Sequence, residues 1–209
     1  MDPMKIRRSA FVLAICPLFF IAAQAPKPPP PAAKAPLKIY SDSANGVSFN
    51  YPADWKMSRE PSFYLLPLIF YPQQSAQAMV SFRPSGPHLE TNFDGLEFAY
   101  VASQEPSQTS CLERVTKEID PEERRLQTVT INGTRFFDIN TGDAGLCHQA
   151  NRNIYEIYRH GTCFLFEAAF YTVCPDPDDG RVQLTAAQSK ALSRPLDAII
   201  QTVKISSVK

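Results

Sequence analysis

The dipeptide Asn132-Gly133 restricts the fold of this chain more than any other local feature. It separates two runs of alternating apolar and polar residues, LQTVTI at 126–131 and TRFFDIN at 134–140. A two-residue turn of type I′ needs positive φ at both positions, and asparagine followed by glycine is the preferred pair there. The sequence therefore predicts a β-hairpin over 126–140 with an antiparallel sheet around it.

Further strands are predicted on both sides of this hairpin. Val47, Phe49 and Tyr51 alternate with polar residues, which is the pattern of a strand with one buried face. The segment FYLLPLIFY at 63–71 is apolar on both faces, and AMVSFRP at 78–84 forms a shorter apolar run. Both are expected to be strands, the first a buried strand with an edge or a bulge at Pro67.

Two amphipathic helices are predicted to flank the strands. The first follows Thr91 and Asn92, whose side chains suit a helix N-cap, and its apolar face would carry Phe93, Leu96 and Tyr100. In the second, Thr185 and Gln188 have capping-box spacing and Pro195 suits a first helical turn. Its apolar positions are Leu196, Ile199, Ile200 and Val203. The predicted fold class is α+β, a mainly antiparallel β-sheet with flanking helices.

The amino terminus has the order of a secretory signal peptide. Lys5, Arg7 and Arg8 precede an apolar stretch over 10–23, and Ala23-Gln24-Ala25 forms a small-residue cleavage site. Because the stretch is shorter than the ~20 residues of a membrane-spanning helix, we expect cleavage after Ala25 and no transmembrane segment thereafter. The expected location is exported, either periplasmic or extracellular.

The remaining chain divides into a spacer and one domain. Residues 26–36, PKPPPPAAKAP, contain six prolines and form a Pro-rich linker, and 37–209 are expected to fold as a single domain. The whole chain has 21 basic and 21 acidic residues. Removing 1–25 takes away three basic residues and one acidic residue. A chain with this slight acidic excess is not expected to bind nucleic acid, which requires a basic surface.

The stretch 147–174 carries three cysteines and two histidines, a density compatible with a metal site, a nucleophile or disulfides. Removing the signal peptide leaves four cysteines in an oxidising compartment, which allow three pairings. A hairpin with His160-Gly161 as its turn places Arg159 opposite Thr162, and Cys147 then faces Cys174.

The same hairpin excludes the other two pairings. Cys163 is separated from Cys174 by eleven residues of strand, ~36 Å, and from Cys147 by a similar length. Disulfide formation requires α-carbons within about 7 Å. The predicted disulfides are therefore Cys147 with Cys174 and Cys111 with Cys163.

Motifs of catalysis and metal binding do not match the sequence. It contains no G-x-S-x-G elbow, and of its three histidines His88 and His160 are interpreted as loop and turn residues. Zinc spacings are absent, and the loop after Asp176 lacks the final glutamate of a calcium loop. We expect no metal and no cofactor. One alternative stays open, a small hydrolase with a site assembled from loops near Asp143, His148 and Asp176.

The segment GVSFNYPADWKM resembles the opening strand and turn of PsbP-like domains. The matching positions are Gly46, Phe49, Tyr51, Pro52 and Trp55. The closing LDAIIQTVKI at 196–205 is similar to the last helix and strand of that superfamily. The resemblance implies an α/β/α sandwich, used there by extrinsic photosystem proteins, a nuclear-import accessory factor and bacterial envelope proteins. It transfers no catalytic residue.

These observations favour an exported, non-catalytic binding or accessory protein of the cell envelope. Its partner is expected to be an envelope protein or a small ligand, whose identity the sequence does not give. The hydrolase is the alternative, and it would require the side chains of Asp143, His148 and Asp176 to converge in a pocket.

Overall fold

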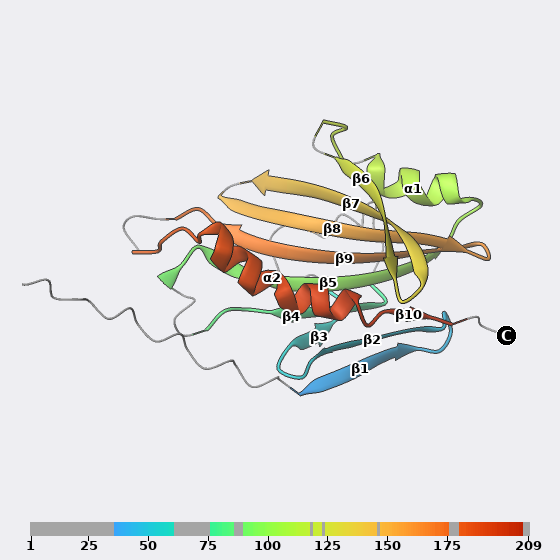
Figure 1. Cartoon of the computed structure of the whole chain (residues 1–209), viewed down its shortest axis with the longest axis horizontal. Coiled ribbons are helices and arrows are strands. Elements are labelled where there is room, and N and C mark those ends of the chain that lie inside the picture. Colours follow the sequence, from blue (N-terminus) through green and yellow to red (C-terminus); the bar gives the residue numbers. More distant parts are fainter. Residues whose placement is uncertain are drawn as a thin grey trace, which may run out of the picture. The chain divides into compact units, whose positions relative to one another are not determined.

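The computed structural model describes residues 36–60, 76–85, 90–117, 119–122, 124–145, 147–175 and 180–206, with the side chains of residues 143 and 145 excepted (Figure 1). They belong to the compact unit Ala35–Lys209. The predicted signal peptide over 1–25, nearly all of the predicted linker and the predicted strand over 63–71 lie outside the described residues.

Most described strands form one antiparallel sheet, the large sheet, in the order β3-β4-β5-β9-β8-β7-β6. The predicted antiparallel architecture is thus confirmed, including the strand predicted over 78–84. The strand bounds are Lys56–Ser58 for β3, Ala78–Phe82 for β4, Phe93–Gln104 for β5, Arg125–Ile131 for β6, Thr134–Gly145 for β7, His148–Arg159 for β8 and Thr162–Val173 for β9.

Both predicted two-residue turns are confirmed. Asn132 and Gly133 have φ of 49° and 75°, and His160 and Gly161 have φ of 49° and 82°. Positive φ at both central positions matches the twist of the flanking strands. The second hairpin has the predicted register, in which Arg159 lies opposite Thr162.

The helix predicted after Thr91 and Asn92 is wrong, because the segment forms strand β5. A β-bulge explains the misleading pattern. Phe93 pairs with Thr172 while Gly95 pairs with Tyr171, so one extra residue is inserted between them. The insertion puts Phe93 and Leu96 on the same face although they are three residues apart, which imitates helical spacing.

Two helices cover opposite faces of the large sheet (Figure 1). Helix α1, Gln108–Thr116, packs Cys111 and Val115 into a cluster that includes Leu165. Helix α2, Ala186–Ile200, belongs with the cluster that contains Phe166. Successive residues of a strand point to opposite faces, so Leu165 and Phe166 define an α1 face and an α2 face of the sheet.

The two helices differ in how well the sequence predicted them. Helix α1 was not predicted, because its capping box joins Ser107 to Ser110 and lacks the usual acidic or amide residue. The Thr185 capping box of α2 is confirmed. The position assigned to Pro195 is wrong, since it lies inside α2 and not in a first turn. Proline has no backbone N–H, so the helix lacks one hydrogen bond at Pro195. The Thr185 cap before it and the buried residues after it still favour one continuous helix.

A small sheet completes the α2 side of the core. It has the order β1-β2-β10, with bounds Leu37–Asp42, Val47–Pro52 and Lys204–Ile205. As predicted, alternate residues of β2 are buried, and the ring of Phe49 lies 5.1 Å from that of Phe98 on β5. Within the described ranges, no helix combines the length and apolar character needed to cross a membrane.

Candidate binding groove

The three residues of the hydrolase hypothesis are not brought together by any described contact. Asp176 and the side chain of Asp143 lie outside the described residues. His148 begins strand β8, and its position in the strand places it on the α1 face. Of the other histidines, His88 lies outside the described residues, and His160 is exposed in its hairpin turn as expected.

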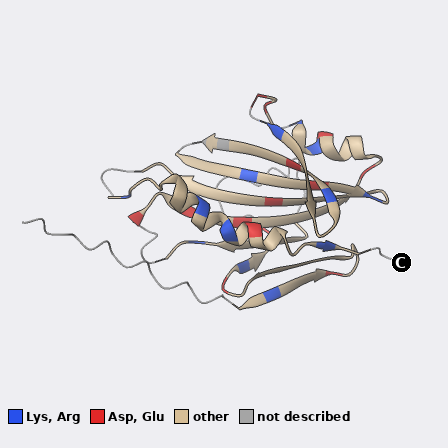
Figure 2. Cartoon of the chain, in the orientation of Figure 1, with Lys and Arg blue, Asp and Glu red and all other residues tan. Residues whose placement is uncertain are grey.

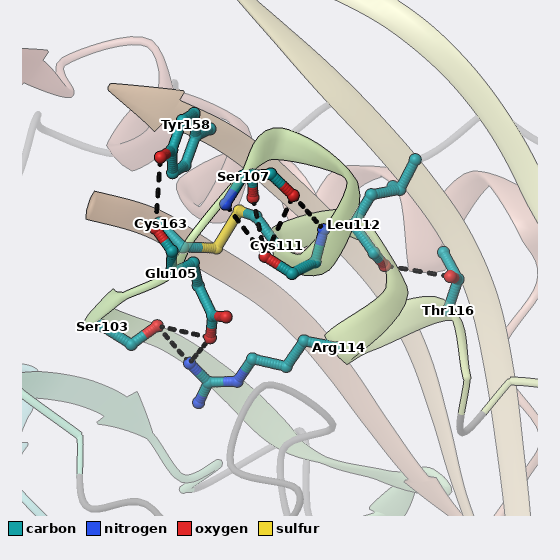
Figure 3. The surroundings of a disulfide bond; sticks show 10 residues. Ser103, Glu105, Ser107, Cys111, Leu112, Arg114, Thr116, Tyr158 and Cys163 are labelled. Carbon is teal, nitrogen blue, oxygen red and sulfur yellow. Dashed lines mark hydrogen bonds and ion pairs between the residues drawn. A yellow bond between two sulfur atoms is a disulfide. The ribbon is translucent and has the colours of Figure 1, made fainter. Parts of the chain in front are cut away.

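The cysteines follow the predicted geometry in part. Cys111 and Cys163 form a disulfide that ties α1 to β9, with both residues buried (Figure 3). Cys147 and Cys174 carry free thiols in the structure, and the Cys174 N–H donates to the Cys147 carbonyl at 2.8 Å. A hydrogen bond between the two side chains raises the pKa of the Cys174 thiol. Their pairing as a disulfide stays a prediction.

Polar contacts around the disulfide hold α1 against the strand ends. The Arg114 guanidinium contacts the hydroxyl of Ser103 and lies 3.7 Å from the Glu105 carboxylate (Figure 3). The Tyr158 hydroxyl donates to the Glu105 carbonyl at 3.1 Å. These contacts and the disulfide join α1 to the ends of β5, β8 and β9.

A groove of about 370 Å³ lies between α2 and the α2 face of strands β8 and β9. Its floor is formed by side chains that are nearly buried, Tyr155, Ala168, Phe170 and Leu196. The volume is at the lower end of the range found for small-molecule sites, and a largely apolar floor is typical of them. We call this hollow the α2 groove.

The rim of the α2 groove is rich in groups that both donate and accept hydrogen bonds. Its amide side chains are Asn92, Gln149, Asn151, Asn153 and Gln183. Hydroxyl groups come from Thr172, Ser189 and Ser193. Among the described residues, the charged ones that line it are Lys190 and Asp197. Figure 2 shows basic and acidic residues interspersed along both helices.

Several lining groups are fixed by their neighbours. The Asn92 side-chain oxygen accepts the Leu184 N–H at 2.8 Å, and that of Asn153 accepts from Asn140 at 2.9 Å. Burial, with a smaller contribution from the charge of Asp138, raises the pKa of Tyr155 to about 12, so its hydroxyl stays protonated. Held in this way, these groups need little reordering when a ligand binds.

A second hollow continues the α2 groove toward β7. It is lined by Gly142, Ala144 and Arg125 and shares Gln149 and Asn151 with the α2 groove. Alternation in "HQANRNIY" marks residues 149, 151 and 153 as one face, but the sequence analysis did not identify them as a site. The wall of the α2 groove opposite β8 is formed by helix α2, which lies about forty residues later in the chain. No local pattern connects the two walls.

The α1 face carries buried charges that the sequence analysis also missed. Arg152 is fully buried and lies 2.5 Å from the Glu167 carboxylate. The Tyr171 hydroxyl donates to Glu97 at 3.3 Å, and both of these residues are buried. All four lie on the α1 face of β5, β8 or β9, where charged residues at alternate positions predict a solvent-exposed side.

Glu156 is a further buried charged residue of the same face. It is 0% exposed, and within the described part of the chain neither carboxylate oxygen has a hydrogen-bond partner. Burial raises its pKa from the ordinary 4.5 to about 7. The folded protein therefore favours the protonated, uncharged acid.

Replacing Glu156 with glutamine should remove a pH dependence of stability. Because the pKa of Glu156 is raised by folding, its stabilising contribution is fully present below pH 4.5 and is lost as the pH rises through about 7. At pH 9 the variant should exceed the wild type by about 2 to 3 kcal/mol in unfolding free energy, while the two should be similar at pH 4.5. Urea denaturation across this range measures the difference, and parallel pH profiles would contradict it.

Comparisons with known proteins find similarity to solved structures. A scan against family models and a search of curated proteins give no match. Cyanobacterial PsbP from Synechocystis sp. PCC 6803 is 11% identical, with a TM-score of 0.46 and coverage of 85% of this chain and 96% of that one. LpqN of Mycobacterium tuberculosis, described as involved in cell envelope biogenesis, is 10% identical, with a TM-score of 0.42 and coverage of 85% and 88%.

A third structure extends this set. The Saccharomyces cerevisiae Ran-binding protein Mog1p is 8% identical, with a TM-score of 0.45 and coverage of 82% of this chain and 96% of that one. The three similarities extend over most of each chain at low identity. No residue role is carried over from them.

Proposed function

We propose that this chain is an exported, non-catalytic binding or accessory protein of the cell envelope, and that the α2 groove is its binding site. The observation that carries the proposal is the lining of the groove, with fixed amides and hydroxyls above a nearly buried floor. A few oriented polar groups over apolar surface are the usual composition of a ligand site.

The lining favours binding over catalysis. The described residues that form the α2 groove include no histidine, cysteine or glutamate. Asp197 is the one aspartate among them, and no histidine of this lining could activate Ser189 or Ser193 as a nucleophile. General acid–base chemistry needs a positioned group with a pKa near the working pH. His148, the base of the alternative hydrolase, belongs to the opposite face of β8.

Export is supported by the amino-terminal pattern and by the disulfide between Cys111 and Cys163. Disulfides persist in oxidising compartments and are rare in the cytosol. We expect the mature protein to begin near Pro26, because the small-residue site ends at Ala25. Mass spectrometry of secreted or periplasmic material measures this terminus, and recovery of the uncleaved chain from the cytoplasm would contradict export.

Filling the α2 groove should weaken ligand binding. Ser193 lines the groove from α2, so Ser193→Trp places an indole in the space the ligand would occupy. Thermal denaturation of the purified protein, with and without a low-molecular-weight extract of the source cell's envelope, measures binding as stabilisation. The wild type should be stabilised by the extract, and the variant should lose at least about tenfold in apparent affinity.

Ala198→Trp is the matched control. Ala198 is an exposed residue of the same helix and does not line the groove. It should leave extract-dependent stabilisation unchanged. Equal stabilisation of wild type and Ser193→Trp, or none of either, would show that the groove is not the binding site.

A further inference from the structure

The amide side chains around the α2 groove indicate the chemistry of its ligand. Each amide offers a carbonyl acceptor and an N–H donor. A hydroxyl group also donates and accepts, so a ligand rich in hydroxyls satisfies both functions of each amide. Asn151, Asn153 and Gln149 follow one another at every second position of β8, which presents a row of such groups along the groove.

The charges of the groove argue against an ionic ligand. Lys190 and Asp197 are the charged side chains in its described lining, and their formal charges cancel. A carboxylate or phosphate placed beside the Asp197 carboxylate would meet a like charge, which is unfavourable. Sites for phosphate or carboxylate ligands commonly use arginine or several cations, and the described lining offers one lysine. The lining therefore fits a neutral molecule.

The floor of the groove offers an apolar surface of limited extent. Tyr155 is 8% exposed and Phe170 is 7% exposed, and both line the groove. The exposed parts of the two side chains add a small apolar area to the groove, and Tyr155 also carries a hydroxyl. A sugar ring has one apolar C–H face and a rim of hydroxyls, and this floor and rim complement both.

A peptide is less suited to this location. Extended peptides bind by pairing their backbone with an exposed sheet edge. The groove lies on a sheet face, where β8 is already hydrogen-bonded to both β7 and β9. The backbone groups of β8 are therefore not available, and side chains alone must recognise the ligand.

The second hollow indicates a ligand longer than one ring. It shares Gln149 and Asn151 with the α2 groove and continues over β7 at Gly142 and Ala144. In its described lining, the charged residues are Arg125 and Glu122, whose formal charges cancel as those of the α2 groove do. Gly142 and Ala144 have short side chains, so the surface of β7 next to Gln149 and Asn151 has room for a second sugar ring. Gln149 and Asn151 would contact the part of the chain that crosses from one hollow to the other.

We infer that the α2 groove binds a neutral oligosaccharide, with its hydroxyls on the Asn and Gln side chains of β8 and a sugar ring over Tyr155 and Phe170. This inference rests on the proposed function and specifies the ligand class of the same site. The interaction is binding alone, and no bond of the saccharide is broken.

The test is a titration of the purified exported protein followed by NMR. The probes are chitotetraose, cellotetraose and maltotetraose as neutral oligosaccharides, with a neutral glycan array to widen the set. Tetragalacturonate serves as an acidic saccharide, and a Gly/Ser peptide of similar length serves as a neutral peptide. At least one neutral glycan should shift the side-chain amide signals of Gln149 and Asn151, and these shifts should be absent with the acidic and peptide probes.

The combined variant Gln149→Ala with Asn151→Ala should weaken that binding by about tenfold or more, because a tenfold change corresponds to about one lost hydrogen-bond contribution. Gln108→Ala removes an exposed amide on α1 and should leave the affinity unchanged. Tighter binding of the acidic or peptide probe, an unaffected double variant, or no neutral glycan bound at ~10 mM would each overturn the inference. If the envelope extract still gives stabilisation that depends on Ser193, the proposed function stands and only the ligand class is wrong.

Discussion

Replacing Arg152 with alanine should lower the free energy of unfolding by about 3 to 5 kcal/mol. Arg152 is 0% exposed, its guanidinium lies 2.5 Å from Glu167, and it also lies 5.6 Å from the centre of the Tyr171 ring. Removing the arginine leaves the Glu167 carboxylate buried without this cation. Urea denaturation at neutral pH measures the loss.

Two further variants distinguish the effect of breaking the buried ion pair from the effect of replacing any arginine with alanine. Arg135 is an exposed arginine of β7, and Arg135→Ala should change stability by no more than about 0.5 kcal/mol. Arg152→Met combined with Glu167→Leu removes both charges and keeps much of the volume, so it should recover a large part of the lost stability. If Arg152→Ala is as stable as Arg135→Ala, the prediction is wrong and breaking the buried ion pair does not lower the unfolding free energy.

Removing the disulfide between Cys111 and Cys163 should cost about 4 kcal/mol in unfolding free energy, the value expected for a loop of this length in the chain-entropy account. The two residues are 52 positions apart, and both are fully buried where α1 meets β9. The variant Cys111→Ala with Cys163→Ala, compared with the oxidised wild type in urea, measures the effect.

Reduction and peptide mapping provide the controls for this prediction. Reductant should destabilise the wild type and leave the Cys111→Ala, Cys163→Ala variant less affected. Non-reducing peptide mapping of the exported protein should link Cys111 to Cys163 and Cys147 to Cys174. A peptide that links Cys163 to Cys174, or four free thiols, would contradict the hairpin register or the oxidised state.

Local chemistry made part of the fold predictable. Asn132-Gly133 and His160-Gly161 determine their turns through backbone conformations that few residues adopt, and each turn then sets the register of two strands. The capping box at Thr185 is equally local. From one of these registers the position of Cys147 opposite Cys174 followed directly, as did the exclusion of Cys163 as its partner.

Features that depend on distant segments were missed. The bulge near Gly95 is visible only from the pairing of β5 with β9, some seventy residues later. Arg152 and Glu156 look like surface residues of an alternating strand until the α1 face is seen to be covered. The α2 groove needs β8 and α2 together, and no sequence spacing relates Asn151 to Ser193. Side-chain neighbours of this kind arise from tertiary packing, which overrides local pattern.

The pairing of β2 with β10 has a consequence for the order of events during synthesis. The Asn50 N–H donates to the Thr202 hydroxyl at 2.8 Å across 152 positions, and β10 pairs with Ser48 and Val47. The hairpins of β6 to β9 use nearby residues and can close early, whereas contacts between distant residues form late. Before residue 186 is synthesised, the apolar side of β2 lacks α2, and before residue 204 β2 has no β10 to pair with. The small sheet and the α2 side of the core can therefore be completed only after translation has passed residue 205.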